Sequence, residues 1–216
     1  MNLNELFKLQ AKLDEKIVKE KGLEGQDLLN KKILALQVEL GELAQNWRGF
    51  KYWSNDQKPR TTAKCEMCDG LGNDIYFTGS YDNGTLQECS EPCEYCDGTG
   101  NDDSKNQLLE EYVDCLHFIL SIGLELGMDE IAGELDLKKF DLSTSNTILS
   151  CFIGLSYDIA DLYYQKENDD MASFLYEHIL LEFAKLGKAL GFTWQQVEQA
   201  YLEKNKINHE RQEQGY

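Results

Sequence analysis

The sequence predicts an all-α protein, a helical bundle interrupted by one small cysteine-rich insertion. Through most of the 216 residues, apolar side chains recur at the spacing of three and four that is typical of amphipathic helices. This periodicity disappears between residues 54 and 106, where Gly, Asp, Asn and Cys dominate. We therefore expect one helical domain built from residues 1–53 and 107–216, with residues 54–106 as a separate insertion.

Two helices are predicted before the insertion. The first spans residues 2–22, with Asn4 as its candidate N-cap and Gly22 as its candidate stop. The second runs from residue 29 to residue 49. The apolar stripe of the first helix consists of Leu6, Leu9, Leu13 and Ile17. The corresponding stripe of the second helix consists of Leu36, Leu40 and Leu43.

Four segments after the insertion repeat the helical pattern. We expect helices over residues 108–127, 144–166 and 169–190, and a last helix that opens at the capping box Thr193-Trp-Gln-Gln196. Gly191 is expected to end the helix before it. Cys115 and Cys151 fall within apolar helical patterns, so we expect both to be buried thiols. Five or six helices, with strands only in the insertion, define an all-α bundle.

The chain is strongly acidic, with 39 acidic and 21 basic residues and a net charge of −18. Non-specific binding of nucleic acid needs a basic face, so we expect no nucleic-acid partner. The acidity fits solubility, and it also fits an anionic substrate held by metal ions and a few placed cations. No run of 18 apolar residues is present, and the N-terminus MNLNELFKLQ lacks the pattern of a signal peptide. The sequence thus predicts no membrane span and a cytoplasmic location.

The insertion holds two near repeats, Cys65-Glu-Met-Cys68-Asp-Gly-Leu-Gly and Cys93-Glu-Tyr-Cys96-Asp-Gly-Thr-Gly. Two such pairs supply the four thiolates that a single structural Zn²⁺ ion prefers, and their glycines let backbone N–H groups approach sulfur. The alternative is a pair of disulfides or loosely held thiols, which a cytosolic location disfavours. Cys89 has no partner in the zinc scheme. The repeats resemble the knuckles of the DnaJ chaperone zinc domain, but two of them suffice for only one metal ion and do not imply chaperone activity.

Two short strands are also expected in the insertion, at residues 75–78 and 85–87. They flank Tyr81-Asp-Asn-Gly84, in which Asn-Gly is a strong signal for a hairpin turn. The insertion is short in apolar residues, so hydrophobic burial alone cannot fold it.

Two helices each carry a pair of carboxylates three residues apart. Glu39 and Glu42 lie in the helix before the insertion, and Glu111 and Asp114 lie in the helix after it. This spacing places each pair on one helical face, and the opposite faces are apolar. Four such oxygen ligands from facing helices predict a site for a hard divalent cation such as Mg²⁺. The alternative is a pair of ordinary solvated faces, because charge pairs at this spacing are common.

Other polar side chains share faces with these carboxylates or recur at helical spacing. His117 and Phe118 follow the last carboxylate by three and four residues, which favours a pocket wall over a solvated surface. Near the C-terminus, Lys204, Asn208 and Arg211 recur at spacings of four and three. Their ammonium, amide and guanidinium groups suit a polyphosphate, although an ordinary polar terminal helix can show the same spacing.

Three motifs together resemble those of a known family. They are E-L-G-E-L-A at residues 39–44, E-E-Y-V-D-x-L-H-F at residues 110–118 and K-N-x-x-N-x-x-R-Q-x-x-G-Y at residues 204–216. In this order they are similar to the motifs of the dimeric all-α dUTPases, which belong with the MazG-type enzymes to the all-α nucleoside triphosphate pyrophosphohydrolase superfamily. The resemblance covers nearly the whole chain except residues 54–106. It implies the helical bundle of that superfamily and a homodimer.

The resemblance implies that the chain hydrolyses dUTP to dUMP and pyrophosphate, which clears dUTP from the nucleotide pool and supplies a precursor of dTMP. Glu39, Glu42, Glu111 and Asp114 would hold two or three Mg²⁺ ions that bridge the triphosphate and hold a water molecule. Glu39 and Glu42 are the expected catalytic residues, with Glu39 as the general base. Metal ions suit this reaction because they lower the pKa of bound water and neutralise phosphate charge.

The resemblance also assigns contacts with the substrate. His117 would touch the sugar 3′-hydroxyl, and Phe118 would leave no room for a 2′-hydroxyl. Gln10 matches the glutamine that reads uracil, since an amide both donates and accepts, whereas Leu13 stands where a second amide is expected. The side chains that would pack against the base are Trp47 and Trp53. The side chains that would hold the phosphates are Lys51, Lys204, Asn208 and Arg211, with Tyr216 close by.

Two other interpretations stay open. One is a MazG-like pyrophosphohydrolase of broader or different nucleotide preference, against which the His117-Phe118 pair and the C-terminal motif argue. The other is a non-catalytic zinc-knuckle interaction protein on a helical scaffold, which the retention of all four carboxylates disfavours. A protein partner could still bind to the insertion.

Overall fold

The computed structural model describes residues 3–82, 85–129 and 147–215. The chain divides into two compact units, one from residues 1–58 and 109–216 and the other from residues 59–108. Tyr216, which the sequence analysis places near the phosphates, lies outside the described residues. The first residues of the helix predicted from residue 144 lie outside them as well.

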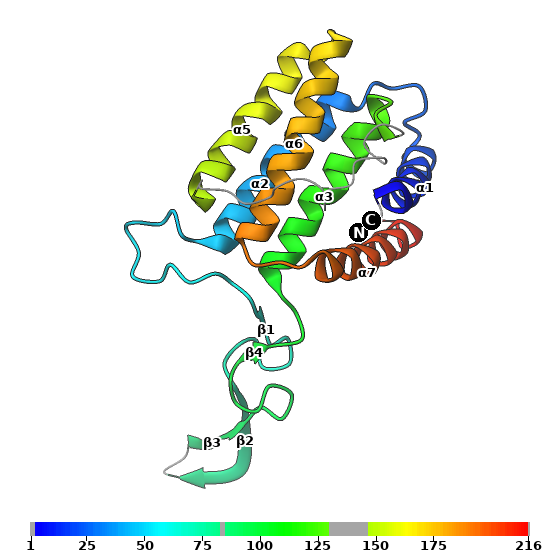
Figure 1. Ribbon diagram of the computed structural model, residues 1–216. Coiled ribbons are helices and arrows are strands. Elements are labelled where there is room, and N and C mark those ends of the chain that lie inside the picture. The colour runs from blue at the N-terminus through cyan, green and yellow to red at the C-terminus, as the bar shows by residue number, and fades with distance from the viewer. Residues whose placement is uncertain (1–2, 83–84, 130–146, 216) are drawn as a thin grey trace. The chain divides into compact units, whose positions relative to one another are not determined.

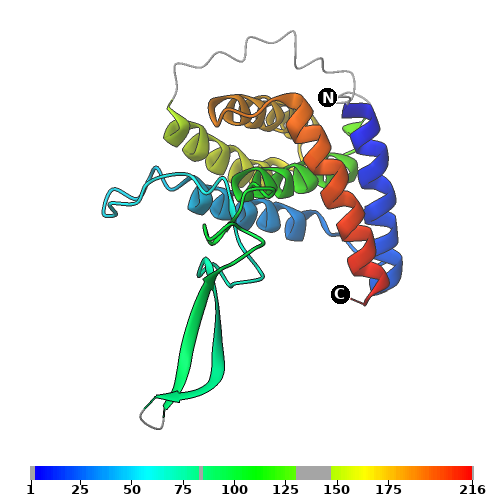
Figure 2. The same ribbon diagram turned by 90° about the horizontal axis from the view of Figure 1, so that it is seen from below.

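The larger unit is helical, which confirms the predicted all-α class (Figure 1). Its described helices are α1 (Leu3–Lys21), α2 (Leu29–Trp47), α3 (Gln107–Glu125), α5 (Ile148–Gln165), α6 (Asp169–Ala189) and α7 (Trp194–Glu213). Helix α5 contacts both α2 and α6, and α1 contacts α7. Figure 2 shows α1 and α7 lying side by side. None of the described helices combines the length and the apolar character needed to cross a membrane.

The helix boundaries follow the local sequence signals in most places. The predicted capping box is confirmed, because the Thr193 side chain accepts from the Gln196 N–H and the Gln196 side chain accepts from the Thr193 N–H. Gly22 and Gly191 follow α1 and α6 with φ angles of +62° and +91°, which glycine adopts without strain. The prediction that Asn4 caps the first helix is wrong, because α1 already begins before it.

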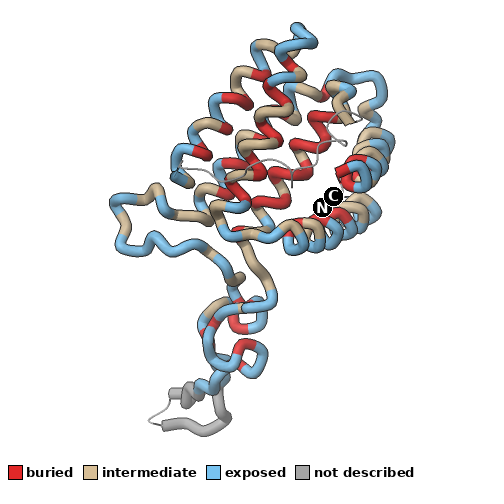
Figure 3. The backbone as a smooth tube through the Cα atoms, in the orientation of Figure 1, coloured by how far each residue is buried: buried red, intermediate tan, exposed pale blue. Residues whose placement is uncertain are grey.

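The core of the helical unit forms where the apolar stripes of its helices face one another (Figure 3). Tyr112 of α3 stacks on Phe183 of α6 with 4.1 Å between ring centres, and its hydroxyl donates to the Phe183 carbonyl. A Cβ at Gly187 would collide with that hydroxyl, so glycine lets α3 and α6 approach closely. Cys115 and Cys151 are buried, as predicted. The predicted stripe residues are also buried: Leu36, Leu40 and Leu43 of α2.

The smaller unit is built from two pairs of antiparallel strands. Strand β2 (Asn73–Asp82) pairs with β3 (Thr85–Pro92), and β1 (Ala63–Lys64) pairs with β4 (Asn101–Asp102). The predicted pairing of two antiparallel strands is therefore confirmed, with strands longer than expected, whereas Asn83 and Gly84 of the predicted turn lie outside the described residues. The buried cluster of this unit consists of four thiols, Cys65, Cys68, Cys93 and Cys96.

Candidate functional site

The helical unit contains a pocket of about 310 Å³ whose wall is built by side chains of α1, α2, α3 and α7. This volume lies at the lower end of the range that is common for ligand sites, roughly 300–1,000 Å³. Eight of the site residues that the sequence predicts in the helical unit meet here. The predicted residues in its wall are Gln10, Glu39, Asp114, His117, Phe118, Lys204, Asn208 and Arg211.

Three carboxylates converge at this pocket. Glu39 of α2 and the Glu111–Asp114 pair of α3 each offer an oxygen, and these oxygens all lie within 4.8 Å of one another. Lys204 Nζ donates to Asp114 Oδ2 at 2.6 Å, and Asn46 Nδ2 donates to Glu111 Oε1 at 3.1 Å. Oxygen ligands at this separation suit a hard divalent cation. The three carboxylates therefore form a group that could hold a metal ion.

Burial and mutual repulsion change the acidity of this cluster. Burial, together with the charges of Asp114, Glu42 and Glu111, raises the pKa of Glu39 from 4.5 to about 7. Burial, followed by the charges of Asp114 and Glu42, also raises the pKa of Glu111. Glu42 itself is exposed, and its oxygens are not among those that converge. The structure thus brings together three of the four predicted metal ligands, with Glu42 acting on them through its charge.

A buried hydrogen-bond network fixes His117 at the pocket. His117 Nδ1 lies 2.7 Å from Gln10 Oε1, which also accepts from the Tyr201 hydroxyl at 2.9 Å. Burial and the charge of Lys204 lower the pKa of His117 to about 3, so the imidazole is neutral. A carbonyl oxygen can only accept, so Nδ1 carries the hydrogen and Nε2 carries a lone pair. Among the described residues, His117 Nε2 is buried and has no hydrogen-bond partner.

Further pocket residues were not anticipated from the sequence. Asp14 accepts from Gln10 Nε2 at 2.7 Å, from Lys32 Nζ at 3.1 Å and from the Ser121 hydroxyl. Asp14 follows Gln10 by four residues, and Ser121 follows His117 by four, so helical spacing alone could have placed both on the pocket faces. The pocket wall also includes Ile17 and Gln212.

Several predicted substrate residues do not reach this pocket. Trp47 packs on Phe152 with 5.4 Å between ring centres and lines a different hollow between α2 and α5. Trp53 is 65% exposed. Lys51 Nζ lies 5.7 Å from the centre of the Phe50 ring. The structure gives no support to contacts of Trp47, Trp53 or Lys51 with the substrate, and these assignments stay predictions.

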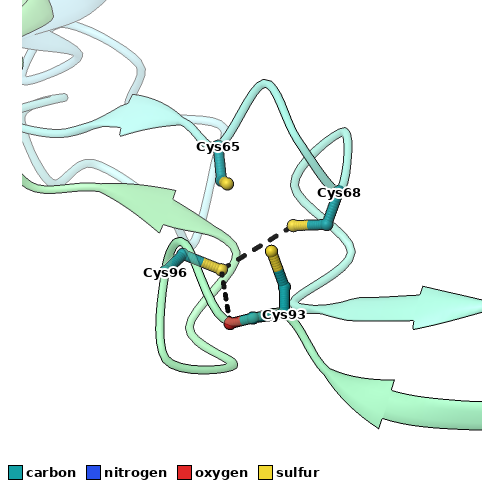
Figure 4. Close-up of side chains that lie close together, drawn as sticks. All are labelled: Cys65, Cys68, Cys93 and Cys96. Atoms are coloured by element: carbon teal, nitrogen blue, oxygen red, sulfur yellow. Dashed lines mark hydrogen bonds between the residues drawn. The ribbon is translucent and has the colours of Figure 1, made fainter.

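The smaller unit brings its four predicted thiols together (Figure 4). The sulfur atoms of Cys65, Cys68, Cys93 and Cys96 all lie within 4.8 Å of one another, and those of Cys68 and Cys96 are 3.7 Å apart. No disulfide joins the six cysteines whose side chains the structure describes. The arrangement is that of a four-sulfur group that could hold a metal ion.

The two cysteine repeats fold into matching loops. The Gly72 N–H donates to Cys68 Sγ at 3.3 Å, and the Gly100 N–H donates to Cys96 Sγ at 3.2 Å. Both glycines have a φ of +75°, and a Cβ at either one would collide with a carbonyl oxygen of the opposite loop. The predicted approach of backbone N–H groups to sulfur is confirmed, and it stabilises the thiolate form that binds metals.

Most of the chain matches the model of a known protein family. A family model described as dUTPase matches residues 2–90 and 98–216. The matched residues include the helices that carry the carboxylates, the whole pocket wall and the first cysteine pair. No curated protein and no solved structure matches the chain.

The substitution Glu39→Gln should stabilise the fold in buffer free of Mg²⁺, because it removes one of three repelling charges. The folded chain holds the Glu39 proton more tightly than the unfolded chain, since the pKa rises from 4.5 to about 7. The stability that Glu39 contributes is therefore complete below pH 4.5 and is lost as the pH rises to about 7. We expect the melting temperature of the variant to exceed that of the native chain at pH 8. Solvent screening limits the gain to a few °C.

Thermal unfolding followed by circular dichroism between pH 5 and pH 8 measures this difference. The control is Glu24→Gln, at an exposed position between α1 and α2. A gain that stays constant over this pH range would show that the charge of Glu39 is not its cause.

Proposed function

The chain belongs to the dUTPase family, and we propose that the pocket among α1, α2, α3 and α7 is where it hydrolyses dUTP to dUMP and pyrophosphate. Family membership identifies the chain as a hydrolase that acts on this nucleoside triphosphate. The observation that carries the assignment to this pocket is the convergence of Glu39, Glu111 and Asp114 next to Lys204. Carboxylates and a lysine ammonium together supply the means to bind cations and phosphate in one place.

The acidic cluster fits divalent ions, and we assign two or three Mg²⁺ to it. Its oxygens lie close enough to share a cation, and burial, followed by the charges of neighbouring carboxylates, raises the pKa values of Glu39 and Glu111. Mg²⁺ bound there would supply positive charge, neutralise phosphate oxygens and lower the pKa of a water molecule. Glu42 is included among the proposed Mg²⁺ ligands because its charge contributes to the raised pKa values of Glu39 and Glu111.

Glu39 is the proposed general base, and its carboxylate receives the proton of the attacking water. It lines the pocket next to the other converging carboxylates, where one of its oxygens can take a proton from a bound water. Lys204, Asn208 and Arg211 line the same pocket, where their N–H groups can donate to phosphate oxygens. The attack then frees pyrophosphate and leaves dUMP.

His117 and Phe118 are the proposed readers of the sugar. His117 Nε2 carries a lone pair that is buried without a partner among the described residues, so it can accept from the 3′-hydroxyl. Phe118 lines the same pocket, where its ring can occupy the space that a 2′-hydroxyl needs. The Phe118 ring would thereby favour deoxyribonucleotides, whereas the contact of His117 would serve both kinds of sugar.

The four thiols of the smaller unit are the proposed site of one structural Zn²⁺ ion. Four sulfur ligands close the tetrahedral coordination of Zn²⁺ and leave no open position for chemistry. The four thiols form the buried cluster of the unit. The stability of the unit should therefore depend on a metal ion that links them. Zinc binding and folding of the unit should therefore be coupled.

An exposed apolar surface on α2 and α5 is the proposed contact of a homodimer. Leu149, Ile153 and Tyr157 recur every four residues on α5 and are 45%, 63% and 67% exposed. Leu34 and Val38 of α2 are 61% and 52% exposed. An apolar hollow of about 340 Å³ lies between the two helices. Such a surface indicates a protein contact, and homodimerisation is what the family resemblance implies.

Pyrophosphate release from dUTP, dTTP, dCTP and UTP, with and without Mg²⁺, tests the proposed active site. We expect Mg²⁺-dependent turnover that is confined to dUTP. Glu39→Gln should lower kcat by about 10²–10⁴-fold, the range for loss of a general base, while Glu24→Gln keeps the native rate. Native turnover in the Glu39→Gln variant would place the reaction elsewhere. Turnover of many nucleotides would instead indicate a MazG-like preference.

Elemental analysis of protein purified without chelator tests the zinc site. We expect one zinc per chain, because the four sulfur ligands converge on one point. Cys93→Ser should lose this zinc, whereas Cys151→Ser should keep it, since Cys151 is buried in α5 outside the cluster. Native protein without zinc would contradict the proposal.

Light scattering coupled to gel filtration tests the dimer. We expect the native chain to elute with twice the mass of one chain. Ile153→Glu should yield monomers, because it places two like charges in a desolvated contact. Leu202→Glu, at an exposed apolar position on α7, should leave the dimer intact. A native chain that elutes with the mass of one chain would rule out the proposed contact.

A further inference from the structure

One polar contact at the acidic cluster joins the two helices that carry its carboxylates. Asn46 Nδ2 of α2 donates to Glu111 Oε1 of α3 at 3.1 Å. Both residues are half-buried. A hydrogen bond to a charged group in such a position contributes more than one between neutral groups in water. The bond therefore fixes how the Glu111 carboxylate is oriented.

Helical geometry explains why Asn46 can reach Glu111. Asn46 follows Glu39 by seven residues, which is two turns of α2 with a residual rotation of about 20°. The two side chains therefore lie on one face of α2, and this face approaches the Glu111–Asp114 pair of α3. A single face of α2 thus supplies one carboxylate of the cluster and the donor that holds another.

Glu111 needs such a donor because its neighbours repel it. One oxygen each of Glu39, Glu111 and Asp114 lies within 4.8 Å of the other two, and like charges at this separation repel one another. Rotation of the Glu111 side chain would relieve this repulsion and carry its oxygen away from the cluster. The Asn46 amide opposes this rotation through one carboxylate oxygen, which leaves lone pairs of the carboxylate for a cation.

Asn46 is placed to act on the cluster rather than on the substrate. Neither Asn46 nor Glu111 is among the residues of the pocket wall. Side chains that orient a ligating carboxylate by a hydrogen bond are common around metal ions, and their loss typically weakens metal binding or activity by about 10–100-fold. An effect of Asn46 on the reaction would therefore pass through Glu111 and the metal ion.

We propose that Asn46 is a positioning residue, which holds Glu111 in the orientation that binds Mg²⁺ and so sets the Mg²⁺ concentration at which the chain is active. This inference rests on the proposed assignment of Mg²⁺ to the acidic cluster. It adds a neutral side chain at the end of α2 to the residues on which metal binding depends.

The variant Asn46→Leu removes the donor and keeps the approximate size of the side chain. The Mg²⁺ concentration that gives half of the maximal rate on dUTP should rise by about 10-fold or more. At saturating Mg²⁺, kcat and the KM for dUTP should stay within about threefold of the native values, because the bound cation then holds Glu111 in place. Gln45→Leu is the matched control, since Gln45 is the exposed neighbouring amide of the same helix.

Calorimetry with Mn²⁺, which also prefers carboxylate ligands, measures metal binding to the zinc-loaded chain without substrate or catalysis. Asn46→Leu should bind Mn²⁺ about 10-fold more weakly than the native chain and Gln45→Leu do. Asn46→Ala removes the same donor, and it decides the matter if circular dichroism shows that the leucine variant does not fold.

Three results would overturn the inference. They are native Mn²⁺ affinity in the folded Asn46 variants, a raised KM for dUTP at saturating Mg²⁺ with unchanged Mn²⁺ affinity, and loss of the fold in both variants. The second result would make Asn46 a substrate contact, and the third would make its bond a requirement for folding. Failure of the proposed metal site itself would look different, because Glu39→Gln would then keep both the native Mn²⁺ affinity and the native turnover of dUTP.

Discussion

The mutual repulsion of three half-buried carboxylates is the constraint that dominates the pocket of the helical unit. One carboxylate oxygen each of Glu39, Glu111 and Asp114 lies within 4.8 Å of the other two, because the opposite faces of α2 and α3 are buried in the core. Apolar burial therefore forces like charges together, and Lys204 and Asn46 compensate them only in part. Because these like charges repel one another, binding of a cation between them would be favourable.

The remainder of the pocket is organised by a polar network that joins α1, α3 and α7. Gln10 stands at its centre, between His117, Tyr201 and Asp14. Tyr201 also stacks on the His117 ring with 4.2 Å between ring centres. Buried polar groups cost free energy unless they are paired, so this network specifies one arrangement of the three helices.

Features of the fold and the pocket that depend on short-range sequence patterns could be predicted, whereas those that depend on contacts between distant residues could not. The apolar periodicity of the sequence predicted the described helices. The spacing of the acidic residues and of the cysteines predicted which carboxylates and thiols converge. A three-residue step turns a helix by about 300°, so Glu42 points away from Glu39 by about 60°, and its exposure could not be read from spacing alone. Trp47 lies four residues after Leu43 on the buried stripe, which explains why it packs on Phe152 of α5. The partners of Gln10 lie 107 and 191 residues away along the chain, so only the fold reveals that its amide is already committed.

The two units also separate two kinds of metal chemistry within one chain. The helical unit offers carboxylate oxygens, which are hard ligands, while the smaller unit offers thiolates, which are soft. Zinc bound by four sulfurs gains far more than zinc bound by carboxylates, so the thiol cluster would draw zinc away from the acidic cluster. The smaller unit has little else to bury, and its glycines leave no room for side chains between the two cysteine loops. The four thiols of the smaller unit thus suit a soft metal ion, whereas the carboxylates of the helical unit suit a hard one.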